Sequence, residues 1–332
     1  MKRRAFIMLL AGAAAAPALL WPLAAPAQQA RKVPRIGVLW HAGSAEEEGS
    51  NFKALVKGFT DLGYIEGRTI ILEHRFPNEV PDRFRSMSAE LVSSGVDVLI
   101  AVGANAAPYA KNASTTIPVV FVLVSDPIGS GLVRSLARPE GNVTGVSNYA
   151  ADLIGKRLEL FKEIVPGLSR VALLVNSNAQ ISSVYIDVFK AATANLGLFG
   201  GTYPWRSPDE LVPAFDAMKQ ADMRGLITCP DGAAYTHRNL ISRLAIERRL
   251  PLSVWSRETL MAGALMSYGA DNNAICQRAA AQVDKILKGT KPGELPVEQP
   301  TKFEFLINLK TVRAIGLDVP PVLLTRADEV IE

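Results

Sequence analysis

The 332-residue sequence is poor in cysteine and histidine, the side chains that most often bind transition metals. It has two cysteines, Cys229 and Cys276, and three histidines, none of which lies at a metal-ligand spacing from another histidine or cysteine. We therefore expect no zinc site and no other metal. Each cysteine lies within an apolar pattern, which favours two buried thiols, although the two could pair in an oxidising compartment.

Sequence motifs of common enzymes are also absent. The sequence has no G-x-S-x-G, no G-x-x-x-x-G-K-[ST] and no G-x-G-x-x-G after its first predicted strand. The lone Gly-Ser-Gly at 129–131 is better explained as a tight loop that leads into a helix predicted over 132–136. We therefore expect a protein that binds without catalysis and that needs no cofactor.

The chain has little excess of either charge. Its 36 Lys and Arg residues against 32 Asp and Glu leave a formal charge of +4. Lys2, Arg3 and Arg4 supply three of these charges before the first acidic residue, Glu46, so the rest of the chain carries +1. Such a balance lacks the positive excess that nucleic acid or an anionic membrane attracts, and we expect neither as a partner.

Residues 1–27 are predicted to be a signal peptide of the twin-arginine type. Arg3 and Arg4 precede an apolar, alanine-rich run over 6–23, and small residues that end at Ala27 suit cleavage there. A permanent membrane anchor is the alternative, but two prolines in the run and the small residues after it favour removal. No cysteine follows to take a lipid, so we expect the mature chain in the periplasm without a stable membrane anchor.

From residue 33 onward, short apolar runs alternate with amphipathic helical stretches. Phe52, Leu55, Val56, Phe59 and Leu62 recur at helical spacing, whereas the run VDVLIAVG is apolar throughout, as expected for a strand covered on both faces. Two such series predict an α/β fold with two doubly wound, Rossmann-like lobes and parallel sheets. The predicted strands are RIGVLW, TIILEHRF, VDVLIAVG, IPVVFVLV and NVTGVSN, then VALLVN, GGTYPW, GLITCPD, LPLSVW and ALMSYG.

Polar residues that follow the predicted strands are candidates for ligand contact, because parallel α/β sheets bind ligands beyond the carboxyl ends of their strands. Asn105 and Ala106 begin a helix whose free N–H groups could hold an anionic group. Asp231 follows a central strand, where a carboxylate would hold an ammonium. His41 is expected to be a loop residue or a cap. The candidate ligand-binding residues are Ser44, Asn105, Ala106, Asp126, Asn176, Asp231, Trp255 and Tyr268.

Several candidates also have a purely structural explanation. Ser44 and Asn105 are equally well explained as helix caps. Asp126 and Asp231 both lie in sequences that favour turns. Trp255 is either a core residue or a platform for an apolar or aromatic ligand. The sequence leaves these alternatives open.

Three long segments resemble one known family. They are GFTDLGYIEGRTIILEHRF, IPVVFVLVSDPIGSGLVRSLARPEGNVTGVS and LPVEQPTKFEFLINLKTVRAIGLDVPPVLLTRADEVIE. In these segments the chain resembles the tryptophan-type substrate-binding proteins of ABC transporters. The resemblance implies a type I periplasmic-binding-protein fold with a three-crossover hinge. It divides the chain into lobe 1, residues 33–147 and 270–298, and lobe 2, residues 148–269 and 299–332.

The resemblance also implies a function and a way of holding the ligand. Members of the family bind amino acids, often aromatic ones, with the carboxylate at a helix start in lobe 1 and the ammonium near an acidic residue in lobe 2. The matching positions here are Asn105 with Ala106, and Asp231. Where some relatives have Thr-Asp-Asn, this chain has Pro230, Asp231 and Gly232. We expect a monomeric periplasmic receptor that closes over a small molecule, an amino acid or a related carboxylate, and delivers it to an ABC permease.

Two other functions are compatible with such a fold. An exported α/β hydrolase or isomerase would use a cleft carboxylate, Asp126 or Asp231, but no nucleophile–base pair accompanies either in the sequence. The ligand-sensing part of a transcription regulator shares the two lobes. That protein would carry a helix-turn-helix ahead of the first strand, where this chain has its export signal.

Overall fold

The structure is a computed structural model that describes residues 32–179 and 181–332. The predicted signal peptide, residues 1–27, lies outside the described residues. Within the described part, none of the helices combines the length and the apolar character needed to cross a bilayer.

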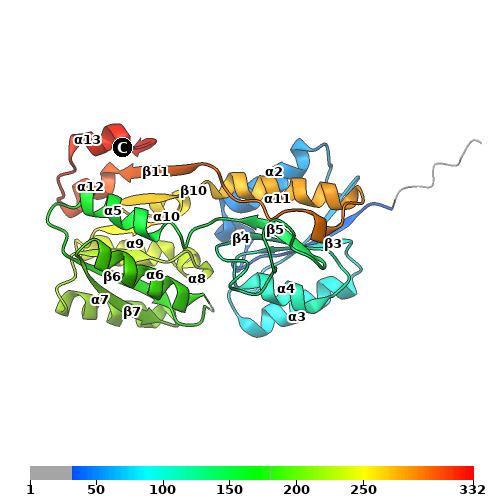
Figure 1. The fold of residues 1–332 in the computed structure, drawn as a ribbon, viewed down its shortest axis with the longest axis horizontal. Helices are drawn as coiled ribbons and strands as arrows, with labels where there is room; N and C mark the ends of the chain where they lie inside the picture. The colour runs from blue at the N-terminus through cyan, green and yellow to red at the C-terminus, as the bar shows by residue number, and fades with distance from the viewer. Residues whose placement is uncertain (1–31, 180) are drawn as a thin grey trace, which may run out of the picture. The chain divides into compact units, whose positions relative to one another are not determined.

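Lobe 1 is built on a five-stranded sheet whose helices come from both ends of the chain. Its elements are β1 (Arg35–Leu39), α1 (Ala45–Glu48), α2 (Ser50–Asp61), β2 (Ile71–Arg75), α3 (Pro81–Ser93), β3 (Val98–Val102), α4 (Ala106–Ala113), β4 (Val119–Val124), β5 (Val143–Ser147), α11 (Asn272–Leu287) and the 3-10 turn η2 (Pro292–Glu294). The strands are all parallel, in the order β2-β1-β3-β4-β5. Every residue of β3 is buried, because α2 and α11 cover one face of the sheet and α3 and α4 the other (Figure 1).

The helix α11 joins lobe 1 although it lies more than a hundred residues after the lobe's last strand. It packs along α2, where Gly58 allows a close approach. A Cβ at Gly58 would lie 2.9 Å from the Cα and the carbonyl oxygen of Gln277. The two helices can therefore meet at this distance only because residue 58 has no side chain.

Lobe 2 is built on a seven-stranded sheet in the order β12-β11-β10-β9-β8-β6-β7. Its elements are α5 (Ile154–Ile164), β6 (Arg170–Asn176), α6 (Ser182–Asn195), β7 (Phe199–Trp205), η1 (Pro208–Glu210), α7 (Leu211–Gln220), β8 (Gly225–Thr228), α8 (Gly232–Thr236), α9 (Arg238–Glu247), β9 (Leu252–Val254), α10 (Arg257–Met261), β10 (Met266–Ala270), β11 (Phe303–Asn308), α12 (Leu309–Ile315), α13 (Pro321–Arg326) and β12 (Glu329–Ile331). Alternate residues of β6 enter two different cores: Val171 and Leu173 pack with α5 and α6, Ala172 and Leu174 with α7 and α9. The predicted two-lobed α/β fold is thus confirmed.

One strand pair departs from the parallel arrangement. β11 runs antiparallel to β10, and Ala270 at the end of β10 pairs with Phe303 at the start of β11. Between these two residues the chain leaves for α11 in lobe 1 and returns, so it re-enters the sheet from the end where it left. A strand that returns this way must run in the opposite direction.

The chain passes between the two sheets after β5, after β10 and before β11. The first and third passages lie next to each other: Val146 forms a parallel bridge with Glu298, and the Ser147 N–H donates to the Glu298 carbonyl at 2.9 Å. The residue boundaries of the lobes in the sequence analysis remain a prediction, but the membership of each strand and of α11 is as described above.

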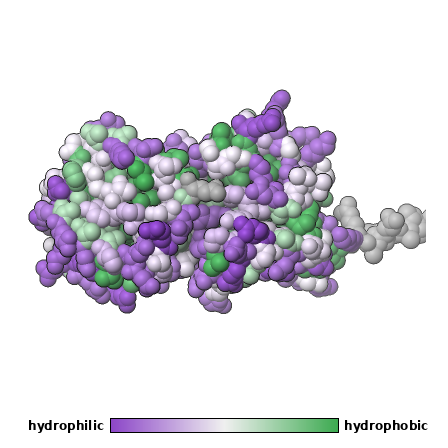
Figure 2. Space-filling view, turned by 90° about the horizontal axis from the view of Figure 1, so that it is seen from below, coloured by the Kyte–Doolittle hydropathy of each residue, from purple (hydrophilic) through white to green (hydrophobic). Residues whose placement is uncertain are grey.

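Three local details differ from or complete the predictions. The segment 132–136 is not a helix; the N–H groups of Leu132 and Val133 both donate to the Pro127 carbonyl, and both side chains are buried against the lobe 1 core. Cys229 and Cys276 are buried free thiols, as predicted. On the surface seen in Figure 2, hydrophobic residues form small patches among hydrophilic ones, because most large apolar side chains lie in the cores.

Candidate functional site

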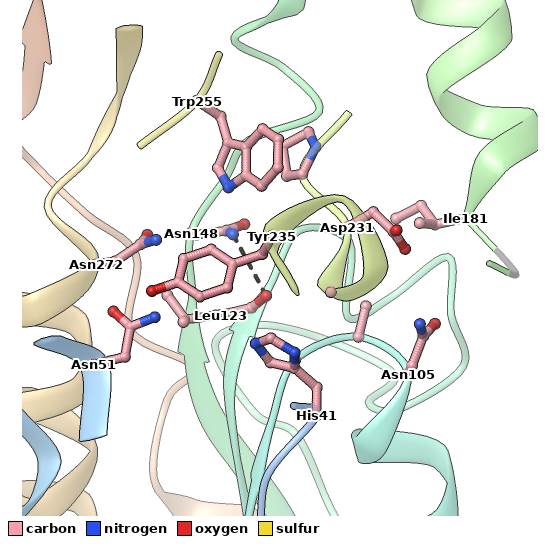
Figure 3. A pocket seen from close by; sticks show the side chains of 14 residues that line it. His41, Asn51, Asn105, Leu123, Asn148, Ile181, Asp231, Tyr235, Trp255 and Asn272 are labelled. Carbon is pink, nitrogen blue, oxygen red and sulfur yellow. Dashed lines mark hydrogen bonds between the residues drawn. The ribbon is translucent and has the colours of Figure 1, made fainter. Parts of the chain in front are cut away.

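Loops at the carboxyl ends of strands from both lobes surround one narrow cavity. Lobe 1 contributes His41 after β1 and Asn105 after β3, and lobe 2 contributes Asp231 after β8, Tyr235 on α8 and Trp255 after β9 (Figure 3). The volume of this cavity is about 40 Å³. Such a space holds one or two water molecules rather than an amino acid.

A larger cavity continues from the same loops. Its volume is about 370 Å³, and Asn105 lines both cavities. The walls carry aromatic rings from both lobes. Phe84 and Tyr109 of lobe 1 stack with ring centroids 5.3 Å apart, and lobe 2 contributes Trp205. Its polar lining includes Glu79, Asn105 and Asn176. A third cavity of about 150 Å³ also includes Asn105, and Asp126 lines it.

His41 lies between two carboxylates at the floor of the cleft. Its Nε2 is 3.3 Å from Glu48 Oε2, and its Nδ1 is 3.3 Å from Glu79 Oε1. Burial opposes a charge on His41, but the attraction of Glu48 and Glu79 outweighs it and raises the pKa of His41 to about 9. The imidazole is therefore a buried cation at neutral pH.

Glu48 is a fully buried acid at the end of the short helix α1. Its Oε1 accepts the backbone N–H groups of His41 and Ala42 at 3.2 and 2.9 Å. Burial raises the pKa of Glu48, while His41 and these two N–H groups act in the opposite direction. Glu48 thus fixes the loop that carries His41 as well as pairing with its ring.

Two tyrosines of lobe 2 form hydrogen bonds with lobe 1 across the cleft. The Tyr235 hydroxyl donates to the Glu48 carbonyl at 3.0 Å, and its ring meets His41 edge-on with centroids 5.5 Å apart. The Tyr185 hydroxyl lies 2.8 Å from Ser125 Oγ. Both tyrosines are buried, where a hydroxyl needs a partner. These two contacts join the lobes directly.

Asp231 is held by neutral donors. It caps α8 by accepting the Ala234 N–H at 3.0 Å, and the Asn176 amide donates to its Oδ1 at 3.1 Å. Burial and then repulsion by Glu79 raise the pKa of Asp231 to about 6. The two carboxylates therefore act on each other across the cleft.

Asn105 and Glu79 are directly linked. The Asn105 amide donates to Glu79 Oε2 at 2.7 Å, and the Asn105 side chain makes no capping bond to α4. Of the two alternatives for Asn105, cap or cleft contact, the structure places it in the cleft.

The other sequence candidates are distributed over the cleft and its surroundings. Ser44 caps α1 by accepting the Glu47 N–H at 3.3 Å and lines none of the three cavities described. Ala106 is buried in the first turn of α4. Asp126 accepts the Gly129 N–H at 2.7 Å, so it forms the turn as well as lining a cavity. Tyr268 lies on β10 and packs against the lobe 2 core, outside the three cavities.

Sequence reasoning missed His41, Glu48, Glu79 and Tyr235 as cleft residues. His41 follows the first strand, so its position was a usable signal. Among residues 32–179 and 181–332, no three His, Cys, Asp or Glu side chains are placed to hold a metal ion.

Comparison with known proteins identifies the family. The family model described as ABC transporter substrate binding protein matches residues 46–331. The chain belongs to this family. Among its relatives, this substrate-binding protein is similar to the "Tyrosine-binding protein" of Clostridioides difficile (strain R20291), with 27% identity over 273 residues, which cover 80% of this chain and 76% of the relative.

Solved structures of other bacterial proteins share the fold of this substrate-binding protein. An ABC domain in complex with L-Trp from Streptococcus pneumonia has 25% identity and a TM-score of 0.83 over 90% of this chain and 99% of that chain. A ligand-free, open substrate-binding protein from Clostridium difficile has 22% identity and a TM-score of 0.66, with the same coverage of 90% and 99%. The prediction of a substrate-binding protein, rather than of an enzyme, is supported.

Proposed function

We propose that this protein binds an amino acid between its two lobes and presents it to an ABC permease in the inner membrane. The observation that carries this proposal is the cleft itself, in which polar groups from both lobes meet at the carboxyl ends of parallel strands. Relatives whose names report tyrosine or L-Trp binding support an amino acid as the ligand class.

The ligand occupies the larger cavity. Its volume of about 370 Å³ falls in the range of about 300 to 1,000 Å³ that is usual for small-molecule sites, whereas the narrow cavity of about 40 Å³ does not. Asn105 and Asn176 offer amide groups from the two lobes, and Asp231 lies behind Asn176. The aromatic walls suit an extended or apolar portion of the ligand.

Function follows from a shift between open and closed forms. A ligand that contacts Asn105 of lobe 1 and Asn176 of lobe 2 at once makes both sets of contacts only when the lobes are closed, so binding stabilises that form. The permease then recognises the closed receptor. No catalytic step is needed, and we propose that the protein is a monomer that acts in the periplasm after removal of the signal peptide near Ala27.

A thermal-shift screen of the mature chain against the twenty common amino acids tests the proposal. A ligand that binds only the folded state raises the melting temperature, and calorimetry then gives its affinity. Asp231→Ala should weaken that affinity, and the bound ligand should be recovered unchanged after long incubation. A flat response to every amino acid would contradict the proposal, and turnover of the ligand would instead favour an enzyme.

A further inference from the structure

Gly232 and Glu79 occupy one shared space at the junction of the lobes. A Cβ built on Gly232 would lie 2.0 Å from Glu79 Oε1 and 3.0 Å from His41 Nδ1. Any other residue at position 232 would therefore displace the Glu79 carboxylate. Gly232, which stands where some relatives have asparagine, thus makes room for an acidic group from the opposite lobe.

The backbone holds Glu79 in this place at a conformational cost. Asn78 and Glu79 are consecutive non-glycine residues with φ of 57° and 56°, in the left-handed region that L-residues rarely adopt. Their N–H groups donate to the Ala42 and His41 carbonyls at 3.1 and 2.9 Å. Strain of this kind is typical of positions that serve a function.

The charges around this carboxylate are mainly negative. His41 pairs with both Glu48 and Glu79, and Glu79 repels Asp231. Arg206 also lines the larger cavity, but it is exposed and pairs with Glu210. These carboxylates would repel an anionic solute, such as one that carries an acidic side chain. A cation beside Glu79 would instead reduce its repulsion of Asp231.

The walls of the larger cavity match the same kind of solute. Glu79 lines that cavity together with the aromatic rings of Phe84, Tyr109 and Trp205, and the guanidinium of Arg206, which also lines it, pairs with Glu210. Rings of this type attract ammonium and guanidinium groups through their π faces. A carboxylate with aromatic walls is an environment suited to an organic cation.

Trp205 gives a second, independent indication that the larger cavity binds a ligand. Its side chain lines the cavity and is only 1% exposed, and its Nε1–H has no acceptor among the residues that the structure describes. A buried indole N–H normally finds a partner, so a ligand that also carries an acceptor atom would satisfy it.

We propose that Glu79, admitted by Gly232, makes this receptor selective for a solute with a net positive charge, a basic amino acid or a related amine or guanidine. This inference rests on the proposed function, because it assumes that the cleft is the ligand site. Glu79 acts as the specificity-determining residue, and the cation of the solute lies beside its carboxylate in the larger cavity.

Calorimetry with two matched probe pairs tests the inference on the mature chain. L-Arginine and L-citrulline have nearly the same shape, but only arginine has a charged side chain. Tyramine and 4-ethylphenol share the phenol ring, but only tyramine carries an ammonium group. We expect the wild-type chain to bind the charged member of at least one pair at least about tenfold more tightly, since charge-assisted bonds are strong. Glu79→Gln should reduce that ratio to within about threefold.

Two further variants separate this role from a structural one. Glu90→Gln changes an exposed glutamate that pairs with Arg75 outside the cleft, and it should keep the wild-type ratio. Gly232→Ala should lower the ratio as Glu79→Gln does. In a Glu79→Gly background no carboxylate lies next to the Cβ of the new alanine, so Gly232→Ala should change the ratio little there. Melting temperatures of all variants control for folding.

Three results would overturn the inference. They are an unchanged ratio in Glu79→Gln, wild-type binding of the neutral member as tight as of the charged one, and no binding of either cation. If L-tyrosine or L-tryptophan binds tightly to both the wild type and Glu79→Gln, the charge selectivity is wrong while the proposed amino-acid receptor stands.

Discussion

The two sides of the cleft hold their polar groups in different ways. On the lobe 1 side His41 is paired with charges, Glu48 and Glu79, deep in the structure. On the lobe 2 side Asp231 is held by neutral donors, a backbone N–H and the Asn176 amide. Breaking a buried charge pair costs much more than losing a cap. Removing a charged group from the lobe 1 side should therefore cost more stability than removing the carboxylate of the lobe 2 side.

The largest effect should follow from removing the cation of lobe 1. We expect His41→Ala to lower the free energy of unfolding by about 3 to 5 kcal/mol, because Glu48 would remain buried without its partner. Urea denaturation measures this change. His237→Ala, at a partly buried histidine that makes an edge-on contact with Trp205, should cost about 1 kcal/mol or less. Equal losses of stability in the two variants would contradict a dominant role of the His41 charge pairs.

Stability should also fall in alkaline solution. His41 has a pKa raised from 6.5 to about 9, so its contribution is complete below pH 6.5 and is lost as the pH rises through 9. The shift corresponds to about 3 kcal/mol at most. Denaturation curves between pH 6 and about 9.5 measure it. His41→Gln should flatten the curve over this range, and an unchanged slope would contradict the assignment to His41.

The lobe 2 side should titrate in a separate and more acidic range. Asp231 has a pKa raised from 3.8 to about 6, so the folded state prefers its protonated form and stability declines as the pH rises from 3.8 to about 6. Asp231→Asn should remove this decline, which the same denaturation series detects at its acidic end. If the decline persisted in Asp231→Asn, another group would be its source.

Loss of the lobe 2 carboxylate should act on affinity. We expect Asp231→Ala to weaken binding of the true ligand by about 1 to 3 kcal/mol, through the loss of a charge-assisted hydrogen bond. Calorimetry measures this loss, and Asp216→Ala serves as the matched control at an exposed carboxylate of α7 that pairs with Arg248 outside the cavities. Unchanged affinity in Asp231→Ala would transfer the ligand contact to other residues.

The smallest effect should be at Ser44. This side chain caps α1 outside the three cavities, so Ser44→Ala should cost about 1 kcal/mol of stability or less and leave affinity unchanged. A combined denaturation and calorimetry experiment checks both expectations. A clear loss of affinity would return Ser44 to the ligand site and extend the lobe 1 side of the cleft.

Much of the fold could be predicted because its strands are continuous apolar runs. VLIAV of β3 is buried on both faces, and that burial requires the pattern seen in the sequence. The prediction of a helix over 132–136 was wrong, because Leu132 and Val133 reach the core from a loop whose N–H groups donate to the Pro127 carbonyl. Apolar spacing alone does not distinguish the two arrangements.

The cleft was harder to predict because its decisive residues have ordinary local sequences. Glu48 ends a run of three glutamates, which is typical of a solvated helix start, yet Glu48 is fully buried while Glu46 is exposed. Glu79 lies between two prolines in a segment that reads as a turn. Its meeting with Gly232 joins residues from different lobes, and no local pattern encodes that contact.

The tyrosine bonds between the lobes bear on how long a ligand stays bound. Opening the cleft must separate Tyr235 from the Glu48 carbonyl and Tyr185 from Ser125, in addition to breaking the ligand's own contacts. Such bonds raise the barrier to release and act chiefly on the dissociation rate. The residence time of a bound solute is thus set partly by hydroxyl groups that hold the two lobes together.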